Sequence, residues 1–149
     1  MSIWFKEYDL ASIAERQQNT LCDHLGITFT AIEEDSLTAT MPCDDRTRQY
    51  MGILHGGASC VLAESVGSVA ANLVIDPDKY RAVGLDINAN HLRPVFKGLV
   101  TGIAKPIMLG KKTHVWEIKL YDEQNKMSCI SRLTMAVIAK EVIKEKYDV

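Results

Sequence analysis

The sequence contains little cysteine, no clustered histidine and no excess of charge. Its four cysteines are far apart and form no CxxC pair, so free thiols are expected rather than disulfides or a zinc site. The four histidines show no metal-ligand spacing, and no metal is predicted. Seventeen basic and nineteen acidic residues give a net charge of −2. This balance argues against a nucleic-acid partner.

The chain also lacks a secretory signal and a convincing membrane span. Its first ten residues have neither a basic region nor a long apolar one, which predicts a cytoplasmic protein. One apolar run, Gly57–Ile75, is long enough to raise the question of a membrane, but Glu64 lies near its middle. We therefore predict a buried helix in a globular protein and no membrane partner.

Hydrophobic periodicity predicts one α+β domain over residues 1–149, with a helical segment at 1–24 and a charged tail at 140–149 that is solvated or a frayed helix. Helical spacing predicts an amphipathic helix at 9–23. Alternating or β-rich runs predict strands at 25–32, 37–41, 83–89, 99–107, 114–120 and 129–137. The breaks at 94–98, 109–112 and 122–126 are short, as consecutive antiparallel strands require. A curved antiparallel sheet wrapped around the long apolar helix is the expected architecture.

Glu64 is the first candidate for chemistry. A lone carboxylate in an apolar helix loses solvation unless a partner or a function accounts for it. It either performs a reaction or is satisfied by hydroxyls or amides at a subunit interface, and the residue alone leaves both open. Ser68, one turn later on the same face, either lines the same cavity or bonds back to its own helix.

His55, Gly56 and Gly57 open the same helix. Unpaired N–H groups and the positive end of the helix dipole favour negative charge there, so this segment predicts an oxyanion site. The alternative is that the two glycines only shape a tight entry into the helix. Gln49, just upstream, either orients a carbonyl or a water, or is a solvated loop residue.

His55 and Glu64 are nine residues apart, which is about 13 Å along a helix and nearly opposite faces. One chain cannot direct both at a single carbonyl. If both serve one reaction, the site is shared between subunits of an obligate homo-oligomer.

Cationic side chains follow two of the predicted strands. His91 and Arg93 come at the end of one strand, and Lys111 and Lys112 occupy a later turn. They either hold phosphate groups or are ordinary exposed residues.

Three segments together resemble the hotdog-fold acyl-CoA thioesterases. They are LHGGASCVLAESVGS at 54–68, GLDINANHLRP at 84–94 and SRLTMAVI at 131–138. More narrowly they resemble the PaaI-like branch, which includes 1,4-dihydroxy-2-naphthoyl-CoA and 4-hydroxybenzoyl-CoA thioesterases. The resemblance covers roughly residues 25–138.

The resemblance implies roles for individual residues. Glu64 would be the base or nucleophile, the Gly56 N–H would polarise the thioester carbonyl, and Gln49 and His55 would hold substrate and water. Ser68 would line the acyl pocket. Further substrate contacts are expected from Gly57, His91, Arg93, Lys111 and Lys112.

The resemblance also implies an activity and an assembly. We expect a hydrolase that acts on an aromatic acyl-CoA such as 1,4-dihydroxy-2-naphthoyl-CoA, with menaquinone biosynthesis as its pathway. No cofactor is expected. Dimers or tetramers are expected. Open alternatives are a medium-chain thioesterase, a proofreading thioesterase for aryl carrier proteins, and a non-catalytic acyl-CoA-binding module. Tyr50-Met51-Gly52 replaces the Pro-Phe-Gly of close relatives, which bears on the choice of acyl group.

Overall fold

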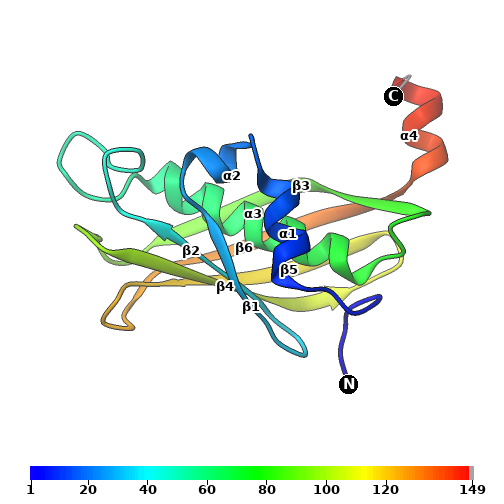
Figure 1. Ribbon diagram of the computed structural model, residues 1–149, viewed down its shortest axis with the longest axis horizontal. Coiled ribbons are helices and arrows are strands. Elements are labelled where there is room, and N and C mark those ends of the chain that lie inside the picture. Colours follow the sequence, from blue (N-terminus) through cyan, green and yellow to red (C-terminus); the bar gives the residue numbers. More distant parts are fainter. Residues whose placement is uncertain (148–149) are drawn as a thin grey trace.

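In the computed structural model, which describes residues 1–147, an antiparallel sheet holds a long central helix against one face (Figure 1). This helix, α3 (Gly56–Val74), contacts every strand from β2 to β6. The strands are β1 (Thr28–Ile32), β2 (Leu37–Pro42), β3 (Tyr80–His91), β4 (Leu99–Leu109), β5 (Thr113–Tyr121) and β6 (Met127–Ala139). The predicted α+β architecture, a sheet around a helix, is confirmed.

The strands lie in the order β1-β2-β4-β5-β6-β3, so β1 and β3 form the two edges. The expectation that β3 and β4 are antiparallel neighbours is wrong, because β3 pairs with β6 instead. The segment between β3 and β4 bonds to the loop that joins β2 to α3. Val95 accepts from the Leu54 N–H and Gly98 accepts from the Cys43 N–H, each at 2.8 Å. The chain thereby passes the N-terminal end of α3 before it enters β4.

Nine of the 19 residues of the helix α3 are buried, and the helix has almost no polar face. A Cβ at Gly67 would lie 2.7 Å from Leu133 of β6, so the helix approaches the sheet closely there. By length and composition alone α3 could span a membrane, and half of that stretch is buried within the protein. The predicted helix boundaries differ from the observed ones by one residue at each end.

The predicted alternation is confirmed in β5, where His114, Trp116 and Ile118 are all buried. It is wrong in β3. Val83 and Leu85 are 40% and 64% exposed, although we expected them to share a face with the core side chain Ile87. A β-bulge between Gly84 and Asp86 adds a residue to this strand, which reverses the alternation beyond it.

The N-terminal segment forms two short helices rather than one. The first, α1 (Leu10–Gln17), starts at Asp9, whose carboxylate accepts from the Ser12 N–H at 2.7 Å. Asn19 has a φ of 59°, which ends the helical path before α2 (Leu21–His24). At the other end, α4 (Lys140–Tyr147) forms most of the charged tail, and residues 148–149 lie outside the described part.

Candidate active site

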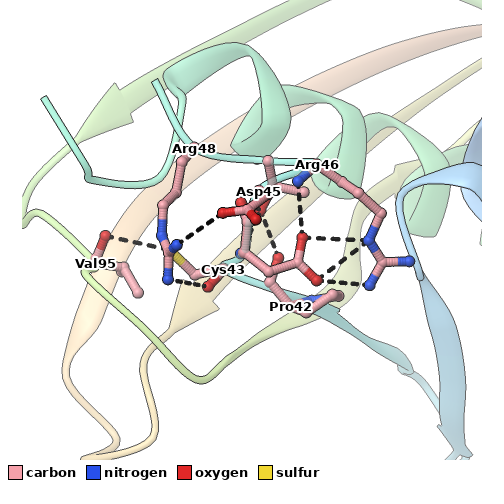
Figure 2. Close-up of polar contacts among 8 residues, drawn as sticks. Pro42, Cys43, Asp45, Arg46, Arg48 and Val95 are labelled. Carbon is pink, nitrogen blue, oxygen red and sulfur yellow. Dashed lines mark hydrogen bonds and ion pairs between the residues drawn. The ribbon is translucent and has the colours of Figure 1, made fainter. Parts of the chain in front are cut away.

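The loop that leads into α3 is held by polar contacts among its own residues and with Pro42 and Val95 (Figure 2). Arg46 donates to both carboxylate oxygens of Asp44, the shortest contact being 2.7 Å, and these hydrogen bonds lower the pKa of that carboxyl. Arg48 donates to Asp45 and to the carbonyl of Cys43. Exposed pairs of this kind add little stability. Their effect is to set the path of the chain into the helix.

Gln49 lies in this loop, and the loop backbone orients its side chain. Its Oε1 accepts a hydrogen bond from the Met51 N–H. Its backbone carbonyl accepts from the Gly52 N–H at 2.9 Å. Because Oε1 is engaged, the Nε2 amide is the end of the side chain left to donate to a ligand.

His55 is the N-cap of α3, and its Nδ1 accepts from the Gly57 N–H at 2.8 Å. A neutral ring therefore carries its proton on Nε2. The bond also occupies the Gly57 N–H, whereas the Gly56 N–H has no acceptor within residues 1–147. Of the two glycines proposed for substrate, Gly56 is thus the one with a free donor at the positive end of the helix.

A cavity of about 330 Å³ opens at this end of α3. It brings together four of the predicted site residues, Gln49, Gly56, His91 and Arg93. The His91 ring packs on the first turn of the helix, since a Cβ at Gly56 would lie 3.0 Å from its Nε2. The side chains of Gln49 and His91 therefore share one cavity with Gly56.

Glu64 does not line that cavity; it lies farther along α3 and faces β3. Its side chain is half-buried and has no hydrogen bond or ion pair within the described chain. Burial raises the pKa of this carboxyl, and no partner offsets the shift. Its Oε1 lies so near the backbone of β3 that a Cβ at Gly84 would be 2.6 Å away.

Ser68 lines a separate cavity of about 160 Å³ between α1 and α3. The rest of this lining consists of apolar side chains from both helices, together with Arg16 and Gln17 of α1 and Asn72 of α3.

Lys111 and Lys112 are exposed in the turn between β4 and β5. Lys111 lines a hollow with Val74 at the C-terminal end of α3. That end is about 27 Å from Gly56 along the helix axis. A single chain therefore does not bring these lysines to the cavity at Gly56.

Sequence reasoning missed the role of Asn72 near the end of α3. Its Nδ2 donates to the carbonyls of Ser68 and Ala82, each at 2.9 Å, and its Oδ1 accepts from the Ala82 N–H at 3.0 Å. The signal available was an amide in an apolar helix, where a buried polar group requires partners. Within residues 1–147, no group of three or more His, Cys, Asp or Glu side chains is placed to hold a metal ion.

An antiparallel sheet wrapped around one long central helix is the arrangement of the hotdog fold. Residues 51–129 match the model of the Thioesterase superfamily. The chain belongs to this superfamily and is a thioester hydrolase.

Individual relatives support this assignment along nearly the whole chain. The crystal structure of a mutant of thioesterase PA1618 from Pseudomonas aeruginosa matches with a TM-score of 0.91 and 51% identity, covering 93% of this chain and 99% of that one. The 1,4-dihydroxy-2-naphthoyl-CoA hydrolase of Escherichia coli (strain K12) is 45% identical over 136 residues, which are 91% of this chain and 99% of that protein. Proofreading thioesterase EntH of Cronobacter turicensis is also 45% identical over 136 residues, or 91% and 98% of the two chains. The predicted resemblance is confirmed at the level of the family.

Proposed function

We propose that the protein hydrolyses an acyl-CoA thioester with an aromatic acyl group, such as 1,4-dihydroxy-2-naphthoyl-CoA. The observation that carries the proposal is the Glu64 carboxylate, which is half-buried, has no partner in the described chain and has a raised pKa. A purely structural carboxylate at such a place needs hydrogen bonds. A raised pKa suits a general base. The name of the relative from Escherichia coli supports the choice of acyl group.

In the proposed reaction, the Gly56 N–H donates to the thioester oxygen as negative charge develops on it. Gln49 and His55 hold the carbonyl or the water. Glu64 either removes a proton from a water that attacks the carbonyl carbon, or attacks that carbon itself to form a mixed anhydride that water then hydrolyses. In both cases the C–S bond breaks, and the free acid and the Glu64 carboxylate are the end products. Coenzyme A leaves as a thiolate, which takes up a proton. Because His91 and Arg93 line the cavity, they would contact the acyl group or the coenzyme A arm.

The proposal includes a site shared by two subunits. It is supported by the separation of Glu64 from the cavity at Gly56 within one chain. In a homodimer, or a tetramer made of two dimers, Gly56 of one protomer would face the Glu64 of another, and Lys111 and Lys112 would approach from a subunit other than the one that supplies Gly56. We further propose that the protein works in the cytoplasm and that its product acid is used in menaquinone biosynthesis.

A second candidate is hydrolysis of an aryl group wrongly attached to a carrier protein. It is favoured by the similarity to proofreading thioesterases EntH of several bacteria, at 43–45% identity. The same residues would perform the chemistry, and only the recognition of the thiol arm would differ. A medium-chain acyl group and a non-catalytic acyl-CoA-binding module are the remaining alternatives.

Steady-state hydrolysis of a thioester panel tests the proposal. The panel contains the 1,4-dihydroxy-2-naphthoyl, 4-hydroxybenzoyl, phenylacetyl, hexanoyl and palmitoyl esters of coenzyme A, and an aryl carrier protein ester. We expect aryl-CoA turnover, and a loss of about 10²–10⁴-fold in kcat for Glu64→Gln. Glu117→Gln, which removes an exposed carboxylate paired with Lys119, is the control and should leave kcat unchanged.

The outcomes separate the candidates. Preference for the carrier protein ester would support the proofreading function, and preference for hexanoyl-CoA the medium-chain one. Binding of the esters without turnover would support the binding module. Equal kcat for Glu64→Gln and the wild type would overturn the assigned role of Glu64.

A further inference from the structure

We propose that Gly84, in the edge strand β3, is a positioning residue for Glu64. This inference rests on the proposed function of Glu64. A Cβ at position 84 would lie 2.6 Å from Glu64 Oε1 and 3.6 Å from its Cδ, so the carboxylate occupies the space that any other residue would fill. The missing side chain thereby sets where the carboxylate can rest.

The backbone conformation does not account for the glycine. The glycines with positive φ in the described chain are Gly26, Gly52 and Gly98, and Gly84 is not among them. An alanine can therefore adopt the backbone angles at position 84 without strain. The methyl group of an alanine would, however, displace the Glu64 carboxylate from its present position.

The bulge in β3 keeps Gly84 directed at the helix. Gly84 pairs with the buried Met135, and after the bulge Ile87 pairs with the buried Leu133. Leu85, the additional residue, is 64% exposed. The inward positions on either side of the bulge, 84 and 87, are thus three positions apart along the chain, whereas in a regular strand they would be two apart. Bulges are common beside active sites, where they direct particular positions toward the chemistry.

Asn72 holds β3 in place two residues before Gly84. Its amide bonds both the N–H and the carbonyl of Ala82, at 3.0 Å and 2.9 Å. Because the strand is anchored there, a methyl group at position 84 should displace the carboxylate and not the backbone. Glu64 Oε1 is the end of a flexible side chain, so the displacement costs the fold little. Misplacing a catalytic group by about 1 Å can cost about 10²-fold in rate.

Gly84→Ala tests this inference. We expect kcat to fall by about 10- to 100-fold with KM and the melting temperature close to wild type. Val83→Ala, on the opposite face of the same strand, should keep the wild-type kcat. In a Glu64→Ala background the Gly84→Ala substitution should have no further effect, because the group that it displaces is gone. In a Glu64→Asp background, whose shorter side chain makes room for the methyl group, its cost in kcat should shrink.

The result separates this inference from the proposed function. If Glu64→Ala is as active as wild type, the proposed function fails. If Glu64→Ala is inactive while Gly84→Ala keeps the wild-type kcat, only the positioning role is overturned. If Gly84→Ala destabilises the fold, the double variant with Glu64→Ala decides. Restored stability supports the contact with Glu64, and persistent instability shows that the strand itself requires the glycine.

Discussion

Glu64 and His114 are ionisable side chains that burial shifts toward their neutral forms. Burial raises the pKa of Glu64 and lowers the pKa of His114. Glu64 is half-buried and is the proposed base or nucleophile, whereas His114 is 2% exposed beside Trp116, with ring centroids 6.4 Å apart. His114 Nδ1 is buried without a hydrogen-bond partner in the described structure. We therefore expect His114 to affect stability rather than catalysis.

The lowered pKa of His114 predicts acid sensitivity. Its main cause is burial, which the backbone of Gly110 partly opposes. The unfolded chain binds a proton with an ordinary pKa of about 6.5, and the folded chain binds it only at lower pH. The contribution of this residue to stability is therefore complete above about pH 6.5 and declines below it. Below about pH 6.5, the free energy of unfolding measured in urea should decrease as the pH is lowered, by up to about 1.4 kcal/mol per pH unit.

The substitution His114→Phe should flatten this pH dependence, since it removes the buried titrating group while keeping a ring beside Trp116. His24→Gln, at a histidine exposed on α2, serves as the control and should leave the slope as in wild type. A slope that persists in His114→Phe would assign the acid sensitivity to another group.

At the scale of elements, the amide of Asn72 joins α3 to the edge strand β3. Asn72→Ala would leave the N–H and the carbonyl of Ala82 without these bonds, and Ala82 is 5% exposed. We expect the free energy of unfolding, measured by urea denaturation, to drop by about 1–3 kcal/mol. Asn88→Ala, on the exposed face of β3, is the matched control. Equal stability of the two variants would contradict the anchoring role.

An element could be predicted when the local sequence pattern determines it, and could not when contacts with distant segments determine it. The central helix was predicted to within one residue because its apolar run is continuous from Gly57 to Ile75. The alternation in β5 was read correctly because no bulge interrupts its buried positions. In β3 the extra residue, Leu85, shifts the strand by one position, so apolar side chains that alternate in the sequence lie on different faces before and after the bulge. The pairing of β3 with β6 depends on contacts across the whole domain, which local pattern does not record.

The site could be predicted in part for similar reasons. Gln49, Gly56, His91 and Arg93 lie in or beside segments with recognisable motifs, and the structure gathers them around one cavity. Gly84 also stood within a quoted motif, yet only the packing of Glu64 against it shows what its missing side chain does.

At the scale of the whole molecule, the proposed division of the site between subunits can be tested by complementation. Glu64→Gln and Gln49→Ala should each be inactive alone. If Gln49 of one protomer works with the Glu64 of another, exchange of subunits between the two variants should restore about a quarter of the wild-type activity. Light scattering should give the mass of a dimer or tetramer. An active monomer, or no recovery after verified subunit exchange, would contradict a shared site.

The order of the elements along the chain also bears on how the protein is made. The apolar helix α3 leaves the ribosome before β4, β5 and β6, which supply much of its cover. At a synthesis rate of about 5–20 residues per second, α3 waits several seconds for those strands. During this interval the nascent chain exposes its most apolar segment, and the edge strand β3 has no neighbour until β6 arrives. The period before β6 is synthesised is therefore when this protein is most exposed to aggregation and most dependent on chaperones.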